Sequence, residues 1–345
     1  MGVQIHNLVK DYQQVITMKN LYGKKLTIDA FNWIYQFLST IRSGDGQPLK
    51  NYNHEVTSHL SGIFYRTIKL IEENIKPIYV FDGKPNALKY QEIQKRKEIR
   101  KIAENNYHDI EETDNKTEIK KYAQSTSKLN TTMINSAKEL LTALGVPIVN
   151  AIEDGEAQAS YMIQKGDAWA CATQDYDSFL FGADRIIRNL SVGKTKKSHN
   201  KTIQNEIEFY SLQKTLEKLN ITQEQFVTIG ILVGVDFFEG IKGIGEKNAY
   251  KYVQQYDTLQ NIIDNTKDKY NYSQLTPSFI EMVQNIFLHP KKNDDYQLQW
   301  HKINKEKVIE IMVEKNNFNK ERIEKSLEPL CTHNSKQSNL SFLLK

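Results

Sequence analysis

The chain has little of what marks a secreted, membrane-embedded or redox-active protein. It holds only two cysteines, Cys171 and Cys331, and neither belongs to a metal-binding or redox-active spacing. So few thiols fit a reducing compartment best. No apolar run approaches the ~18 residues of a membrane-spanning helix, because the longest covers only residues 229–235. We therefore expect a chain without a membrane span that works in a reducing compartment.

Signals for processing and for two common enzyme classes are missing as well. No charged-then-apolar leader opens the chain, so we expect no secretion signal. Met1-Gly2 suggests myristoylation, but His6 stands where that motif needs Ser or Thr. There is no Walker A loop, no HExxH motif and no Cys/His set for zinc. These absences argue against a P-loop nucleotide hydrolase and against a zinc enzyme.

Short apolar runs alternate along the chain with segments of helical periodicity. The runs resemble buried strands, and the amphipathic segments between them resemble helices. Such alternation predicts an α/β fold with a mostly parallel, doubly wound sheet. The predicted strands cover residues 24–30, 78–81, 146–151, 169–173 and 185–190, and predicted helices include residues 32–38, 58–74 and 133–144.

The chain divides by composition into four parts. Residues 1–208 contain all the predicted strands and form the α/β core. Within it, residues 84–130 are highly charged and lack glycine, which predicts exposed helices or a mobile insertion. Residues 209–330 are predicted to be helical, and residues 331–345 form a flexible tail.

Seven acidic residues stand where the strand-like runs stop or where the next segment begins. Ligand sites of open α/β sheets lie just past the carboxyl ends of the strands. Taken singly, each residue has an ordinary explanation as a helix cap or a turn residue. Their repetition at successive strand ends is much harder to explain that way. The seven are Asp29, Asp82, Asp154, Glu156, Asp175, Asp177 and Asp236.

A cluster of carboxylates at one sheet edge cannot stay ionised without cations nearby. Mg²⁺ takes oxygen ligands and retains several waters, so some carboxylates would act through water. Two such ions about 3.5–4 Å apart can clamp the attacking and leaving oxygens of a phosphoryl displacement. The pattern therefore predicts a magnesium site for phosphoryl chemistry.

Basic residues and glycines predict contacts with a polyanion. The net charge is only +4, but residues 84–101 carry seven bases against two acids, and residues 188–201 carry five bases and no acid. One such stretch alone would be explained as a solvated helix face. The segment GIKGIG, residues 240–245, joins two predicted helices within residues 223–256. It is typical of a helix–hairpin–helix, whose glycines let backbone amides approach a phosphate, with a tight helix–helix turn as the alternative.

Five blocks in this order resemble the structure-specific 5′ nucleases, and most closely the flap endonucleases of the archaeal and eukaryotic type. The resemblance covers nearly the whole chain, including its opening MGVQ. It implies a PIN-like 5′ nuclease core with a helical arch. The blocks are IDAFNWIYQFL, VFDGKP, EDGEAQASYM, ATQDYDSFLF and VGVDFFEGIKGIGEKNA.

The resemblance also implies roles for individual residues. The seven carboxylates would hold two Mg²⁺ ions per subunit. Lys89 and Arg96, on one face of a helix, would steer the scissile phosphate, and residues 84–130 would form an arch over the 5′ flap. Tyr35 would stack on a base at the single-strand/double-strand junction. The implied DNA-binding residues are Gly2, Tyr35, Arg42, Lys242, Gly243, Gly245 and Lys247.

The chain departs from the family pattern at several positions. Asp154 stands where the family has Glu, which shortens the reach of that ligand by one methylene. Asn86 replaces a proline, and Phe237-Phe238 replaces a turn that begins with tyrosine. The tail keeps only part of the family's box for binding a sliding clamp, and a disordered polar end is the alternative reading. The clamp-binding residues would be Gln337, Leu340, Leu343 and Leu344.

Together these features predict a monomeric, Mg²⁺-dependent nuclease. It would cut branched DNA at the base of a 5′ flap, act as a 5′–3′ exonuclease at nicks or gaps, and bind a sliding clamp through its tail. An archaeal cytoplasm or nucleoid is the favoured location, and a nucleus is the eukaryotic one. The alternatives are a sister nuclease of nicks, bubbles or four-way junctions, an aspartyl phosphatase, and a catalytically silent DNA-binding protein.

Overall fold

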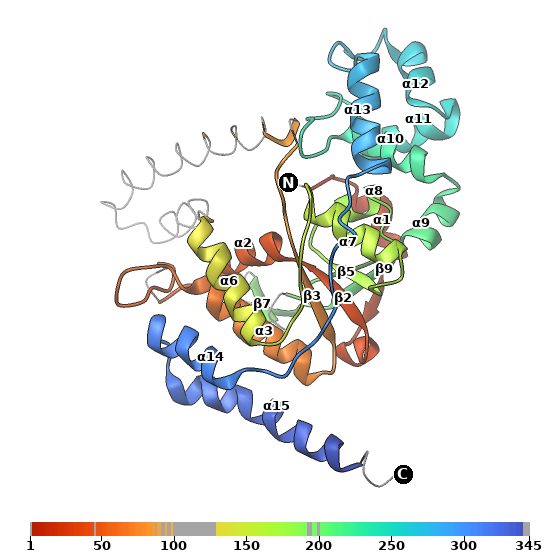
Figure 1. The fold of residues 1–345 in the computed structure, drawn as a ribbon. Coiled ribbons are helices and arrows are strands. Elements are labelled where there is room, and N and C mark those ends of the chain that lie inside the picture. The colour runs from red at the N-terminus through yellow and green to blue at the C-terminus, as the bar shows by residue number, and fades with distance from the viewer. Residues whose placement is uncertain are drawn as a thin grey trace.

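A mixed sheet of seven strands forms the centre of the molecule (Figure 1). The computed structural model describes residues 2–44, 46–86, 88–90, 94, 98, 129–191, 195–198 and 201–340, with the side chains of residues 195–198, 201–204 and 331–340 left out. Most of the predicted arch, residues 84–130, therefore lies outside the described residues. The strand order is β1-β9-β6-β5-β2-β3-β4.

The sheet confirms the predicted doubly wound class. Neighbouring strands from β4 to β6 run parallel, whereas β9 and β1 are added antiparallel at one edge. The strands are β1 (Gln14–Ile16), β2 (Lys25–Asp29), β3 (Lys76–Phe81), β4 (Ile148–Asn150), β5 (Ala170–Ala172), β6 (Arg185–Arg188) and β9 (Ile207–Ser211), and β7 (Thr195–Ser198) pairs with β8 (Lys201–Gln204) in a separate hairpin.

Helices cover both faces of the sheet because alternate residues of its central strands point to opposite sides. In β3, Ile78 and Val80 belong to one apolar core, and Tyr79 and Phe81 belong to the other. The second core contains α2 (Ala30–Thr40), α3 (Ser58–Glu72) and α6 (Thr131–Ala143). The first contains α7 (Gly155–Gln164), α8 (Asp177–Leu180), α9 (Leu212–Leu219) and α10 (Gln223–Val233).

The remaining helices form two groups (Figure 1). One group follows α10 and packs with it: α11 (Glu246–Tyr256), α12 (Leu259–Thr266) and α13 (Pro277–Leu288). The other packs on α3 and α6: α14 (Lys305–Ile309), the π-helical segment Glu310–Lys315 and α15 (Lys320–Leu340). Short elements open the chain: α1 (His6–Val9) and the 3₁₀ turns Lys10–Tyr12 and Met18–Leu21.

An extended segment between α13 and α14 differs from the predicted helical region. Residues 290–304 are not helical but run back along the core (Figure 1). The backbone of His301 donates to the carbonyl of Gly145 at 2.9 Å, and Trp300 Nε1 donates to the carbonyl of Pro77 at 3.0 Å. Hydrogen bonds to distant parts of the core replace the helical hydrogen bonds. The helices beyond residue 304 thus pack on the core rather than on α10.

The C-terminal helix also differs from the prediction. It continues to Leu340, so the first part of the predicted flexible tail, residues 331–340, is helical. No glycine or proline interrupts those residues. Leu343 and Leu344 lie outside the described residues, as do the side chains of Gln337 and Leu340. Among the described helices, none is both long and apolar enough to span a membrane.

Candidate active site

The acidic residues meet where the strand order of the sheet reverses. β2 and β5 are neighbours, with β3 and β4 on one side and β6 on the other. Asp29 is the last residue of β2, Asp82 follows β3, and Asp175 and Asp177 follow β5. Crevices at such a switch point are where open α/β sheets bind ligands. The topology therefore gathers residues that are far apart in the sequence.

Backbone amides hold one oxygen of several of these carboxylates. Asp29 Oδ1 accepts from the amide of Asn32 at 3.0 Å, which also makes Asp29 the N-cap of α2. Asp82 Oδ1 accepts from the amide of Gly155 at 2.6 Å. A Cβ atom at Gly155 would lie 2.6 Å from that same oxygen, so only glycine permits this approach. These bonds fix how each carboxylate is turned.

Glu156 and Asp177 are both buried, and their carboxylates repel each other. Thr173 donates its hydroxyl to Glu156 Oε1 at 2.8 Å, and Ser178 donates to the same oxygen at 3.3 Å. The amide of Val3 donates to Asp177 Oδ1 at 2.6 Å. The N-terminal segment therefore completes the surroundings of a residue that stands 174 positions later.

Burial and mutual repulsion raise the pKa values of the carboxyl groups. Burial, followed by the charge of Asp82, raises the pKa of Asp29 to about 7. Burial, followed by the charge of Asp236, raises the pKa of Asp177 to about 7. Burial and then Asp177 raise the pKa of Glu156 well above its usual range. The carboxyl groups that repel one another are those of Asp29, Asp82, Glu156, Asp175, Asp177 and Asp236.

Asp82 keeps accessible surface while protein surrounds it on the other sides. The surrounding protein keeps water from part of the carboxylate and so raises the pKa of Asp82, and the ammonium group of Lys89 opposes the rise. Its side chain is nevertheless exposed. Asp82 can therefore face an ion or a substrate that arrives from solvent.

Both side-chain oxygens of Asp154 have protein partners. Oδ1 caps α7 by accepting from the amides of Glu156 at 2.9 Å and Ala157 at 3.4 Å. Oδ2 pairs with the Lys89 ammonium. The capping alternative considered from the sequence is therefore realised at this residue.

Asn86, which departs from the family pattern, caps the helical turn that carries Lys89. Asn86 Oδ1 accepts from the amide of Lys89 at 2.9 Å, which is the geometry of a helix N-cap. Tyr90 donates its amide to the carbonyl of Asn86 at 3.0 Å. Asn86 thus begins the helical turn that carries Lys89. Arg96 lies outside the described residues.

The carboxylates fit hard cations that keep part of their water shell. Carboxyl groups with raised pKa values gain most from a cation that favours their ionised form. Within the described residues, no three acidic, His or Cys side chains enclose a single ion by themselves. Water and substrate oxygens would have to complete the coordination, as is usual for Mg²⁺. The donor set is therefore typical of an open Mg²⁺ site and not of a closed structural metal site.

Sequence reasoning missed two residues that orient the carboxylates, Asn32 and Thr173. Asn32 donates from Nδ2 to Asp175 Oδ2 at 3.0 Å, and Thr173 accepts from the amide of Asp175 at 3.2 Å. Gly2 packs on Asp175, so a Cβ atom there would come within 2.7 Å of the Asp175 Cβ atom. The available signal was position: Asn32 lies one helical turn after Asp29, and Thr173 directly follows β5.

Asp236 and the glycine hairpin lie between α10 and α11. The backbones of Val235 and Phe238 exchange two hydrogen bonds, of 2.8 and 3.0 Å, and place Asp236 in the tight turn between them. In the hairpin that follows, Ile241 and Ile244 are buried, whereas Lys242, Gly243, Gly245 and Lys247 are exposed. Gly245 caps α11 without a side-chain hydrogen bond. The isoleucines therefore anchor a turn in which Lys242, Gly243 and Gly245 are exposed.

The two other predicted DNA-binding side chains lie on or next to α2. Tyr35 is half-buried on this helix. Arg42 follows the helix and donates to the carbonyls of Ser39 at 3.0 Å, Gly46 at 3.0 Å and Leu38 at 3.2 Å. Its guanidinium group thus shapes the loop after α2 in this structure.

The fold and the acidic switch point define a nuclease of the XPG class. Models of the XPG N-terminal domain and the XPG I-region match residues 1–103 and 145–236 of the chain. Those two stretches include all seven acidic residues.

Comparison with individual proteins narrows the class. The chain is 43% identical to flap endonuclease 1 of Ignicoccus hospitalis over 96% of its own length and 95% of that protein. It is 44% identical to flap endonuclease 1 of Pyrococcus abyssi, over 96% and 94% of the two chains. The solved structure of flap endonuclease-1 from Methanococcus jannaschii matches with a TM-score of 0.74 and 38% identity, over 95% and 98%. The chain belongs to the flap endonuclease 1 family.

Proposed function

We propose that this protein is a structure-specific 5′ flap endonuclease that hydrolyses a phosphodiester bond at the base of the flap. The observation that carries the proposal is the convergence of six mutually repelling carboxylates at the switch point of the sheet. An exposed glycine and lysine hairpin follows Asp236 directly. A hydrolytic centre for a polyanion needs both features.

The carboxylates would hold two Mg²⁺ ions. When bound, the two ions would activate the attacking water and stabilise the departing 3′-hydroxyl oxygen. Asp29, Asp82 and Asp177 each have Oδ1 held by a backbone amide, so their carboxylates are oriented before any ion arrives. Asp154 would serve through water, since its two oxygens already have partners.

Lys89 is the cation of this chain that would meet the scissile phosphate. Its charge acts on Asp29, Asp82 and Asp177, which places it beside the carboxylate cluster. The pairing with Asp154 would keep the ammonium group in place between turnovers. A positioned cation of this kind stabilises charge that develops in the transition state. Arg96 is proposed as its partner on the arch.

The hairpin would hold the DNA duplex by its backbone. Buried Ile241 and Ile244 keep the turn rigid, and the exposed amide and lysine groups can face phosphates without reading bases. Binding should therefore weaken as salt rises. DNA structure rather than DNA sequence should decide which substrate is cut, and exonuclease action at nicks or gaps would use the same site.

A direct experiment tests the activity. Labelled 5′-flap, nicked, bubble and blunt DNA are incubated with the protein in Mg²⁺ or in EDTA. We expect Mg²⁺-dependent release of the flap as an oligonucleotide, loss of that release in Asp175→Ala, and normal release in Asp184→Ala, whose carboxylate pairs with Arg185 at 2.7 Å. Cleavage of none of the substrates would refute the proposal. Faster cleavage of bubbles or four-way junctions would favour a sister nuclease instead.

We further propose that the tail binds a sliding clamp and that the chain acts as a monomer where DNA is replicated, in the nucleoid or the nucleus. Gln337 and Leu340 keep two positions of the family's box. Deletion of residues 336–345 should abolish stimulation by the clamp and leave unstimulated cleavage unchanged. Stimulation that survives the deletion would place clamp contact elsewhere.

A further inference from the structure

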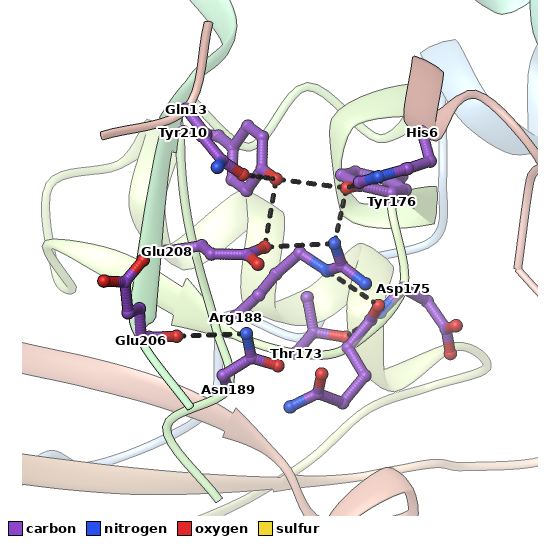
Figure 2. Close-up of polar contacts among 11 residues, drawn as sticks. His6, Gln13, Thr173, Asp175, Tyr176, Arg188, Asn189, Glu206, Glu208 and Tyr210 are labelled. Carbon is purple, nitrogen blue, oxygen red and sulfur yellow. Dashed lines mark hydrogen bonds and ion pairs between the residues drawn. The ribbon is translucent and has the colours of Figure 1, made fainter. Parts of the chain in front are cut away.

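Tyr176 stands between Asp175 and Asp177, and it is buried while its hydroxyl group lies in a network of polar side chains (Figure 2). Three elements supply that network: the N-terminal segment with His6 and Gln13, strand β6 with Arg188, and strand β9 with Glu208 and Tyr210. The loop that carries two acidic residues is therefore tied to three other parts of the molecule.

The hydroxyl group of Tyr176 uses its full hydrogen-bonding capacity. It accepts from Arg188 Nη1 and donates its one proton to the Tyr210 hydroxyl at 3.2 Å. The contact with His6 Nδ1 at 2.8 Å must then be a second acceptor bond, because a phenol has a single proton and two lone pairs. The Tyr210 hydroxyl in turn can donate its one proton to Gln13 Oε1 at 2.9 Å or to Glu208 Oε2 at 3.0 Å.

Arg188 holds both residues that flank Asp175. Its Nε donates to the carbonyl of Gln174 at 3.1 Å, and its guanidinium carbon lies 4.4 Å from the centre of the Tyr176 ring. Glu208 balances the charge at 3.2 Å. The planar guanidinium makes these contacts in different directions at once, which a lysine cannot do.

The N-terminal segment closes the arrangement from the other side. Val3 donates its amide to Asp177 Oδ1 at 2.6 Å, and Gly2 packs on Asp175. Gln13 Oε1 accepts from the Tyr210 hydroxyl at 2.9 Å. Backbone and side chains thus fix residues 174–177 from both sides.

We propose that Tyr176 and Arg188 are positioning residues that orient Asp175 and Asp177 and thereby set the affinity of the site for divalent cations. The proposal rests on the proposed function, because it takes these two residues to be metal ligands. Neither Tyr176 nor Arg188 needs to touch metal or DNA. Partners that orient metal ligands typically contribute 10–100-fold to metal affinity.

The test measures metal binding directly. Tyr176→Phe removes one hydroxyl group, and Arg188→Lys keeps the positive charge but loses the planar guanidinium group. Mn²⁺ is titrated into each protein without DNA, and free Mn²⁺ is followed by its paramagnetic resonance signal. We expect about 10-fold weaker binding in both variants. The Mg²⁺ concentration for half-maximal cleavage should rise to a similar extent, and excess Mg²⁺ should restore much of the rate.

Matched controls exist in the same chain. Arg185 stands at the other end of β6 and makes the same kinds of contact, to the carbonyl of Trp169 at 2.6 Å, to Asp184 at 2.7 Å and to the Trp169 ring. The Tyr79 hydroxyl is buried against Thr67 at 2.7 Å. Arg185→Lys and Tyr79→Phe should leave Mn²⁺ affinity unchanged, even if they lower thermal stability.

Two outcomes would overturn the proposal: unchanged Mn²⁺ affinity in Tyr176→Phe and Arg188→Lys, or equal weakening in the controls. If a variant fails to fold, His6→Ala serves as the test in its place. His6 is exposed, so its replacement should not unfold the protein, and it removes one partner of the Tyr176 hydroxyl. We expect weaker Mn²⁺ binding there too, and unchanged binding would count against the proposal. If the wild-type protein binds Mn²⁺ but cuts no flap, the proposed function is refuted. The role of Tyr176 and Arg188 is then still decided by the Mn²⁺ affinities of the variants.

Discussion

At the scale of single residues, the hydrogen bonds to backbone amides are compatible with the metal binding proposed for this site. Asp29, Asp82, Asp154 and Asp177 each use Oδ1 to accept from a backbone amide. A bond to one oxygen fixes the carboxylate and leaves its other oxygen to turn toward a cation. Asp154 in addition pairs its second oxygen with a described side chain, the ammonium group of Lys89.

Gly155→Ala should impair catalysis without unfolding the protein. The added Cβ atom would lie 2.6 Å from Asp82 Oδ1 and push that carboxylate aside. A misplacement of about 1 Å can slow an enzyme about 10²-fold, so we expect a loss of that order in single-turnover flap cleavage. Gly44→Ala, where a Cβ atom meets open space, is the control. Equal rates for both variants would contradict the role given to this contact.

Lys89→Ala should lower the cleavage rate by about 10²-fold, the usual scale for losing a charge-stabilising donor. Flap affinity should change much less, because a single phosphate contact carries little of it. Rates are measured at saturating DNA and Mg²⁺. Lys69→Ala removes a lysine that pairs with Glu72 and Glu73 on the surface of α3, and it should cut normally. A normal rate in Lys89→Ala would remove this residue from the site.

At the scale of elements, the hairpin between α10 and α11 combines buried and exposed positions within six residues. Ile241 donates its amide to the carbonyl of Leu232 at 2.8 Å, which ties the hairpin to the end of α10. Lys242 and Lys247 remain exposed. The element therefore separates its folding, which uses isoleucine, from its proposed contact with DNA, which would use lysine and backbone.

The double variant Lys242→Ala, Lys247→Ala should weaken DNA binding equally for different sequences. Two lost phosphate contacts should reduce the slope of log affinity against log salt by about 2. Fluorescence anisotropy at several salt concentrations measures this slope. The control is Lys305→Ala, Lys315→Ala, because both lysines pair with glutamates near α14 and the π-helical segment that follows it. A slope that does not change would place the duplex elsewhere.

At the scale of the whole molecule, the metal-free site opposes folding near neutral pH. Folding raises the pKa of Asp29 and of Asp177 to about 7 from near 4, chiefly through burial. An acid whose pKa rises on folding stabilises the folded state only while it is protonated. That contribution is complete below pH 4 and is lost as the pH rises through 7. Cations should reverse the loss, since they favour the ionised form.

The melting temperature in Mg²⁺ minus that in EDTA should therefore grow from pH 5 to pH 8. The difference cancels groups remote from the site, such as His59, whose pKa burial lowers to about 4. At pH 8 the gain should be about 2 °C per kcal/mol of linked binding free energy. In EDTA at pH 8, Asp177→Asn should melt higher than the wild-type chain. An equal Mg²⁺ effect at both pH values would contradict this account.

Much of the fold follows from local sequence patterns. Apolar runs predicted the five parallel strands, because strands buried on both faces are almost continuously apolar. The antiparallel strands β1 and β9 were missed, since their residues are mostly exposed or half-buried and β1 spans only three residues. Residues 290–304 were predicted to be helical, but they form hydrogen bonds with Gly145 and with Pro77 of β3. Contacts between distant segments leave no local pattern.

The sequence by itself determined which chemistry is available: seven carboxylates at segment boundaries, Lys89 beyond a strand end, and a glycine hairpin. Only the tertiary structure decided how they combine. It brought six carboxylates close enough to repel one another, and it paired Asp154 with Lys89 and with the first turn of α7. It also brought the backbone amide of Val3 to Asp177. The physical reason is that residue type is a local property, whereas repulsion, burial and hydrogen bonding depend on distances that the order of strands in the sheet creates.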